Sequence, residues 1–151
     1  MTHDTPRIII EHPQWAQRTC TLICGPPGAG KTTLAHTLHP NIIDIGELPP
    51  GTPRDRMRTF GRLAHKAGRN PNPNTAVIRG APLNADRTHQ QELCRPASTI
   101  IMLTDAATCH DRIEHRARPG IDGRDLAGQH RAVDDWWTAW HTETPRFFHG
   151  E

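Results

Sequence analysis

One glycine-rich segment of the chain carries the residue types that bind phosphate groups. Its residues are Gly25-Pro26-Pro27-Gly28-Ala29-Gly30-Lys31-Thr32, followed by Thr33, and they match the pattern G-x-x-x-x-G-K-[ST] at every fixed position. Glycines let the backbone curl until its N–H groups face phosphate oxygens, and a following helix adds the positive end of its dipole. In such a loop Lys31 reaches the β- and γ-phosphates, while the Thr32 hydroxyl ligates Mg²⁺. The segment 25–33 therefore predicts a nucleotide-binding site.

Two carboxylates lie downstream, at the carboxyl end of an expected strand. They are Asp44 and Glu47, in the segment 41–47. In an open α/β sheet this edge is where ligands bind, on the same side as the glycine-rich loop. A carboxylate there accepts the proton of an attacking hydroxyl or holds Mg²⁺ through water. We expect Asp44 or Glu47 to serve this chemistry; the alternative is an Asp that caps a turn and a solvated Glu.

Two arginines further along are candidates for a mobile lid. Arg112 and Arg116 are i,i+4 neighbours on one helix face, while Cys109 and Ile113 can face the core. Phosphoryl transfer spreads negative charge over the equatorial oxygens, and a guanidinium delivered there stabilises it. The alternative is a solvated face that pairs with neighbouring acidic residues.

The elements that must hold these residues follow from the hydropathy pattern. Strand-like runs occur at 8–11, 19–24, 41–45, 75–79 and 98–104, and helix-like stretches at 30–38, 54–67, 85–93, 106–117 and 125–141. This alternation predicts an α/β domain. We expect one P-loop NTPase domain over 1–151, with a mainly parallel central sheet in a three-layer αβα arrangement, a small arginine-bearing lid, and a loose tail over about 142–151. Asn84, and Thr104 or Asp105, are expected helix N-caps.

Composition excludes several classes of protein. The chain has 151 residues, of which 34% are hydrophobic, and no apolar run approaches the ~20 residues that a membrane helix needs. The first residues lack the features of a signal peptide, so we expect a cytoplasmic protein with no membrane partner.

The four cysteines form no CxxC pair and are expected to be reduced thiols, with Cys20, Leu22 and Cys24 on one strand face. A net charge of +2 does not by itself indicate a nucleic-acid binder.

The order of these motifs narrows the kind of nucleotide-binding protein. The chain lacks an NKxD guanine-reading motif and a strong Walker B strand, and it is small for a motor ATPase. It resembles the polynucleotide-kinase-like small P-loop kinases over about 20–137. The resemblance rests on the loop 25–33, the segment 44–47, the strand–turn–helix 76–87 and the lid 112–120.

This resemblance implies roles for individual residues. Lys31 and Thr32 would bind ATP and Mg²⁺, Asp44 or Glu47 would activate the acceptor hydroxyl, and Arg116 would steady the transferring phosphoryl group. The implied reaction moves the γ-phosphate of ATP to a hydroxyl of a nucleic acid, most simply a 5′-OH end. The family usually has an Asp near the end of the third strand, where this chain has Arg79. Two alternatives stay open: a nucleoside or nucleotide kinase, and an accessory ATPase.

Basic residues supply the candidates for binding the acceptor. Four of them form an i,i+4 stripe on the helix 54–67, apart from an apolar face of that helix. The stripe consists of Arg54, Arg58, Arg62 and Lys66, and the apolar face of Met57, Phe60, Ala64 and Ala67. We expect Arg54, Arg58, Arg79 and Arg87 to contact the phosphates of a nucleic acid; the alternative is that the stripe is a solvated face, as most charge stripes are. The tryptophans near the end of the chain are expected to dock the last helix on the body; they are Trp136, Trp137 and Trp140.

Overall fold

The computed structural model describes residues 7–11, 20–45, 48, 51–70, 74–116 and 126–143. Its elements are β1 (Arg7–Glu11), β2 (Cys20–Cys24), α1 (Lys31–Leu38), β3 (Asn41–Asp44), α2 (Pro53–Ala67), β4 (Thr75–Arg79), α3 (Asn84–Cys94), β5 (Ser98–Leu103), α4 (Ala106–Arg116) and α5 (Leu126–Glu143). Every predicted strand and helix is present, with each end within two residues of its predicted position. The tail was expected to begin at about 142, but α5 continues through Glu143; residues 144–151 lie outside the described part of the chain.

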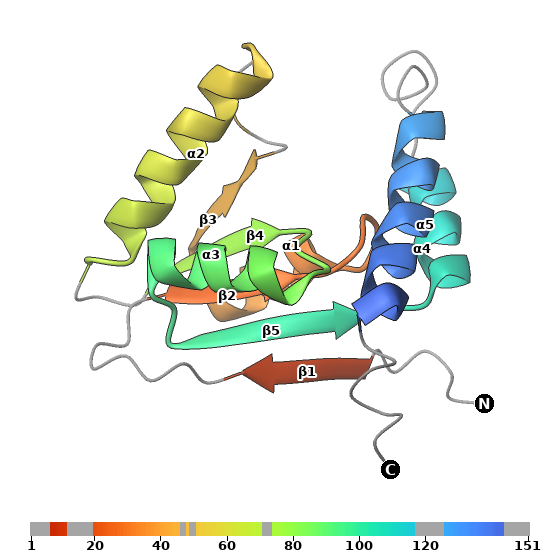
Figure 1. Cartoon of the computed structure of the whole chain (residues 1–151), viewed down its shortest axis with the longest axis horizontal. Helices are drawn as coiled ribbons and strands as arrows, with labels where there is room; N and C mark the ends of the chain where they lie inside the picture. The colour runs from red at the N-terminus through yellow and green to blue at the C-terminus, as the bar shows by residue number, and fades with distance from the viewer. Residues whose placement is uncertain are drawn as a thin grey trace.

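The strands form one five-stranded sheet in the order β1-β5-β2-β4-β3 (Figure 1). Strands β2, β3, β4 and β5 run parallel, as the alternation of strands and helices predicts. Strand β1 pairs antiparallel with β5 at the edge of the sheet. This antiparallel edge was not predicted, because three successive isoleucines carry no signal for strand direction.

Helices cover both faces of the sheet. On one face Ala35 of α1 and Cys109 and Ile113 of α4 pack on Ile23 of β2. On the other face α2 and α3 pack on β2 and β4, with Phe60 at the centre of that cluster. The observed architecture is thus α/β with helices on both sides of a mixed, mostly parallel sheet. Strand β2 is buried along its whole length, and Cys20, Leu22 and Cys24 share the α2–α3 face as predicted.

Helix α5 crosses the carboxyl end of the sheet and contacts both helical layers. Its Val133 joins the cluster of α1 and α4, whereas Trp136 and Trp140 pack against β5 on the opposite face. Trp136 Nε1 donates a hydrogen bond to Gly80 O at 2.8 Å, and Trp137 Nε1 donates to Thr104 O at 3.2 Å. The expectation that the tryptophans dock the last helix is confirmed.

Of the two helix N-caps predicted from the sequence, one is confirmed and one is wrong. Asp105 Oδ1 accepts a hydrogen bond from Thr108 N at 2.7 Å, as an N-cap should. Asn84 instead is the first residue of α3, after Leu83, and its own N–H donates to the carboxylate of Glu143. The cap of α3 therefore comes from α5, distant in sequence, rather than from the local residue.

The described cysteines Cys20, Cys24, Cys94 and Cys109 are buried thiols that form no disulfide with one another. None of the helices in the described ranges has the length and apolar character needed to cross a membrane.

Candidate functional site

The glycine-rich loop joins the end of β2 at Cys24 to the start of α1 at Lys31. Gly28 and Gly30 have φ angles of 78° and 97°, in the region that favours glycine. A Cβ atom on Gly28 would lie 2.7 Å from the carbonyl oxygen of Cys109, so α4 packs directly on the loop. Gly30 precedes α1 without a side-chain cap, and the first turn of α1 holds no acidic residue. The first N–H groups of α1 therefore receive no hydrogen bond from a capping side chain among the described residues.

Lys31 lies at the mouth of the loop. Its Nζ donates to Gly25 O at 2.6 Å and to Pro26 O at 3.0 Å. Burial lowers the pKa of Lys31 to about 8, and the Asp44 carboxylate opposes this shift only in part. The ammonium group is thus desolvated and incompletely neutralised, which favours binding of an additional anion beside it.

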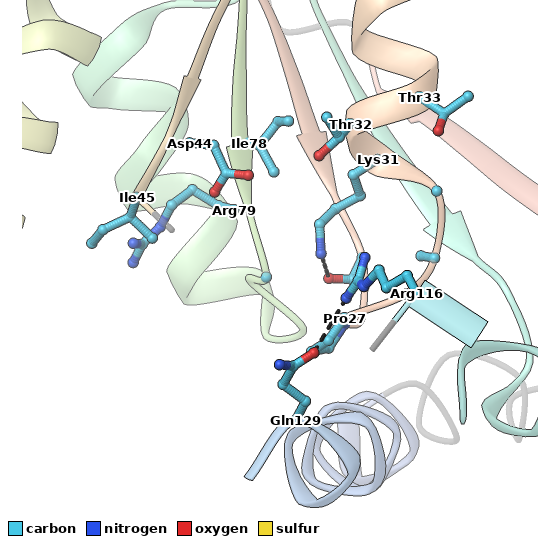
Figure 2. A pocket seen from close by; sticks show the side chains of 15 residues that line it. Pro27, Lys31, Thr32, Thr33, Asp44, Ile45, Ile78, Arg79, Arg116 and Gln129 are labelled. Carbon is cyan, nitrogen blue, oxygen red and sulfur yellow. Dashed lines mark hydrogen bonds between the residues drawn. The ribbon is translucent and has the colours of Figure 1, made fainter. Parts of the chain in front are cut away.

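A cleft of about 420 Å³ opens in front of the loop. Figure 2 shows its lining, which comes from the loop, α1, the ends of the two strands β3 and β4, α4 and α5. The lining residues are Gly25, Pro27, Gly28, Ala29, Gly30, Lys31, Thr32, Thr33, Asp44, Ile45, Ile78, Arg79, Gly80, Arg116 and Gln129. Adjacent parallel strands β2 and β4 lead into helices on opposite faces of the sheet, and ligands of open α/β sheets bind at such a switch point.

Hard oxygen donors stand at two sides of this cleft. Thr32 is the second residue of α1, and Asp44 is the last residue of β3; both side chains lie at the cleft (Figure 2). Within the described ranges, no three His, Cys, Asp or Glu side chains gather into a metal-binding group. A hydroxyl and one carboxylate suit Mg²⁺, which uses few protein ligands and completes its shell with water and substrate phosphates. Glu47, the other expected carboxylate, lies outside the described residues.

The two arginines of α4 have different positions. Arg116 lines the cleft, and its Nη2 donates to Gln129 Oε1 of α5 at 3.4 Å. Arg112 instead donates to the loop carbonyl of Ala29 at 3.0 Å and lies outside the cleft. A second hollow of about 720 Å³ lies on that side of the loop, between α1 and α4. Its lining combines apolar and cationic side chains with hydroxyls and includes Thr33, Leu34, Thr37, Met102, Arg112, His115 and Arg116.

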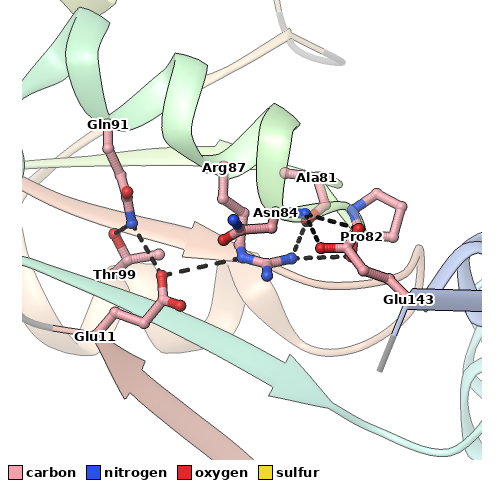
Figure 3. Close-up of polar contacts among 8 residues, drawn as sticks. All are labelled: Glu11, Ala81, Pro82, Asn84, Arg87, Gln91, Thr99 and Glu143. Carbon is pink, nitrogen blue, oxygen red and sulfur yellow. Dashed lines mark hydrogen bonds and ion pairs between the residues drawn. The ribbon is translucent and has the colours of Figure 1, made fainter. Parts of the chain in front are cut away.

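Arg79 and Arg87 were both expected to contact substrate, and the structure separates them. Arg79 lines the cleft at the end of β4, where its guanidinium lies 5.0 Å from the centre of the Phe60 ring. Burial lowers the pKa of Arg79. Arg87 is a correction: its side chain is buried and donates to Ala81 O and Pro82 O (Figure 3). Its partners are protein groups, and it is not among the residues that line the cleft.

The basic stripe of α2 is exposed, as expected, but it does not line the cleft. Arg54 and Arg58 lie on the first turns of α2, which begins shortly after β3 ends. Phe60, Ala64 and Ala67 bury the opposite face as predicted. Met57 was expected on this buried face but is 42% exposed; its Sδ accepts a hydrogen bond from Arg79 Nη1 at 3.7 Å instead of packing in the core.

Gln129 was not predicted as a site residue. It lies on a helix whose spacing indicated only docking, and it reaches the cleft because α5 crosses the sheet end. Lys31, Thr32, Asp44 and Arg116 are brought together as predicted. No protein-family model matches the chain and a search of curated proteins finds no significant relative, so the role of this site rests on its own geometry.

Proposed function

We propose that this chain is a P-loop kinase of the polynucleotide-kinase-like kind, which moves the γ-phosphate of ATP to a hydroxyl at a nucleic-acid end. One observation carries the proposal: Lys31, Thr32, Asp44 and Arg116 converge from α1, β3 and α4 on one cleft, in front of a glycine-rich loop at a helix N-terminus. Each of the four has the chemistry that phosphoryl transfer requires, and together they surround the place where a terminal phosphate would lie.

The loop and Lys31 would bind the triphosphate. The N–H groups of the loop and of the first turn of α1 are donors for phosphate oxygens. Lys31 would exchange its two carbonyl acceptors in the loop for phosphate oxygens, and this exchange would restore its pKa toward the ordinary value. The second hollow, with its apolar and hydroxyl lining, is suited to the nucleoside part because it adjoins the loop through Thr33.

Thr32 and Asp44 would hold Mg²⁺, which when bound neutralises charge on the phosphates. Asp44 is also positioned to accept the proton of an acceptor hydroxyl, because it faces Lys31 across the cleft. Arg116, oriented by Gln129, would place its guanidinium on the developing charge of the transferring group.

The nucleic-acid acceptor is supported by cations beside the cleft. Arg79 lies within it, and Arg54 and Arg58 are exposed on the helix that follows β3. A polynucleotide backbone that leaves the cleft on this side would pass a stripe of positive charge.

The test is a transfer assay with γ-labelled ATP, Mg²⁺ and one of four additions: 5′-OH DNA, 5′-OH RNA, a mixture of nucleosides, or no acceptor. We expect label on an oligonucleotide with the wild type, at least ~100-fold less with Lys31→Ala, and unchanged labelling with Arg131→Ala, an exposed cation of α5. Asp44→Asn should retain ATP binding and lose transfer. Label on nucleosides alone would show that the acceptor is a nucleoside and not a nucleic-acid end. Release of free phosphate alone, or no turnover, would contradict the kinase proposal.

A further inference from the structure

The edge strand β1 is unusual in what it exposes. Its three central residues Ile8, Ile9 and Ile10 are 46%, 39% and 49% exposed, and they point alternately to both faces of the sheet. One side of β1 pairs with β5 in a regular antiparallel register, from Arg7 opposite Leu103 to Glu11 opposite Thr99. Across the described residues, no strand pairs with its other side (Figure 1).

Such an edge lacks the features that keep sheets apart. Natural edge strands carry an inward-pointing charge, a proline or a bulge, since unpaired N–H and C=O groups otherwise bind another strand. In β1 the charges occur only at the two ends, Arg7 and Glu11, and the middle is entirely β-branched. The strand therefore has both the backbone groups and the side chains that favour pairing.

The arrangement of charge identifies the partner. Arg-Ile-Ile-Ile-Glu is complementary to itself when two copies run antiparallel, because the positive end of each then meets the negative end of the other. A parallel arrangement would instead place like charges directly opposite each other. We propose that β1 pairs antiparallel with β1 of a second copy of this chain, about a two-fold axis at Ile9, so that the two sheets become one.

The register follows from this axis. Ile9 lies opposite the partner's Ile9, Ile8 opposite the partner's Ile10, and Arg7 opposite the partner's Glu11. Opposed residues of antiparallel strands share a face, so each pair of opposite charges lies on the α3 side of the joined sheet. The contact is isologous, as two-fold interfaces require.

Glu11, the carboxylate of this proposed ion pair, is already held in place within each subunit. Glu11 Oε1 accepts a hydrogen bond from Gln91 Nε2 at 2.9 Å and lies 4.0 Å from Arg87 Nε, while the carboxylate side chain stays 36% exposed (Figure 3). The partner's Arg7 would approach a carboxylate that is held in place and still reachable. Five residues on each side form a small interface, so we expect an equilibrium that depends on protein concentration.

Sedimentation velocity across a concentration series of the full chain tests the association. The wild type should shift from monomer to dimer as concentration rises. Ile9→Lys, which places a charge at the centre of the edge, should remain monomeric throughout, and Arg7→Glu, which opposes like charges at both ends, should raise the dissociation constant at least ~10-fold. Arg131→Glu on α5 is the matched charge reversal and should leave the dimer unchanged. Circular dichroism and thermal melting of each variant establish that it is folded.

Engineered cysteines test the register. Ile9→Cys lies on the axis, where directly opposed Cβ atoms are about 4.5–5.5 Å apart, and should form an intermolecular disulfide on mild oxidation. Ile8→Cys is the control, because its copies lie diagonally, about 7–8 Å apart, and should cross-link at least ~10-fold more slowly. A wild type that is monomeric at every concentration, a dimer insensitive to Ile9→Lys, or cross-linking through Ile8→Cys at an equal rate would overturn the proposal.

Discussion

Two neighbouring units of this fold have the same local design. In each, a parallel strand ends in a short loop that leads into a helix: β2 into α1, and β4 into α3. In each, a cation of the following helix donates to two carbonyls of its own loop. Lys31 does so in the first unit and Arg87 in the second. The two units lie side by side, since β2 and β4 are hydrogen-bonded neighbours.

The two units differ in whether the protein places an acidic side chain at the N-terminus of the helix. At α3 the chain supplies it: Glu143 accepts the first N–H of the helix, from Asn84, at 3.1 and 3.2 Å (Figure 3), and Glu11 approaches Arg87. At α1 the described residues supply no acidic side chain in the first turn and no side-chain cap. In the β4–α3 unit, here called the closed unit, the protein itself supplies the acidic groups. In the β2–α1 unit, here called the open unit, the start of the helix is available to a ligand. On the proposed function, the open unit would be the binding site and the closed unit its support.

The largest effect should come from removing the cation of the open unit. On the proposed function, Lys31→Ala should lower phosphoryl transfer by about 10³-fold while the chain remains folded, because the lysine would stabilise charge on the transferring group. The measurement is the initial rate of labelling under saturating acceptor, with circular dichroism as the control for folding. A variant that retained more than a tenth of the wild-type rate would remove Lys31 from the mechanism.

Removing the cation of the closed unit should have the opposite pattern. Arg87 binds two carbonyls, lies near Glu11, and places its guanidinium 5.4 Å from the centre of the Trp140 ring. We expect Arg87→Ala to lower the free energy of unfolding by about 3 kcal/mol, because buried acceptors lose a charged donor. Denaturant unfolding measures the loss, and the affinity of the remaining folded protein for Mg²⁺–ATP should be nearly unchanged. A loss of affinity without a loss of stability would reverse the roles of the two units.

The pH dependence of stability distinguishes the cations further. The pKa of Lys31 falls from 10.5 to about 8 on folding because of burial. The unfolded chain therefore binds more protons between these values, so the contribution of Lys31 to stability rises with pH through this window. Relative to Lys31→Met, the wild type should gain about 3 kcal/mol between pH 7.5 and pH 10.5. Parallel unfolding curves of the two proteins at both pH values would show a fully solvated lysine instead.

Removing the charge of Glu143 from the closed unit should lower the free energy of unfolding by less than removing Arg87 does. Glu143→Gln removes the charge at the start of α3 but keeps a hydrogen-bond acceptor, and it should destabilise the fold by about 1 kcal/mol. Thermal unfolding at low salt measures this change, and high salt should reduce it. Glu92→Gln, which removes an exposed carboxylate from the last turn of α3, is the control and should not destabilise the fold, because a negative charge near a helix C-terminus is unfavourable.

The smallest expected effect comes from closing the open unit. Thr33→Glu places a carboxylate in the exposed third position of α1, as Glu143 does for α3. The helix dipole should then stabilise the chain by about 0.5 kcal/mol, while repulsion between this carboxylate and phosphate lowers nucleotide affinity. Thr37→Glu, near the other end of α1, should destabilise instead. Equal changes in melting temperature for the two variants would show that the dipole has no part in the difference between the units.

What the sequence predicted well was local. The loop 25–33 and the alternation of strands and helices were readable because spacing within a few residues determines them. Asp44 was predicted from its place at the end of an expected strand, and Arg116 from its i,i+4 spacing with Arg112 and from the resemblance of the lid to that of small P-loop kinases.

What the sequence could not predict depends on contacts between distant segments. Glu143 meets Asn84 across 59 positions, and Gln129 reaches the cleft only because α5 crosses the end of the sheet. The position of Arg87 along its helix does not distinguish it from an exposed arginine, because it is buried only by packing between distant segments. These residues carry no periodic or motif signal, so their roles emerge only when the layers are assembled.

The most direct test of the open and closed units is a titration of the ¹⁵N-labelled chain with Mg²⁺–ATP, followed through its backbone amide resonances. The amides of Gly28, Gly30, Lys31 and Thr32 should shift with saturation, while those of Asn84 and Ala85 at the start of α3 should not. Equal shifts at both helix N-termini, or none in the loop when ATP is in large excess, would contradict the account.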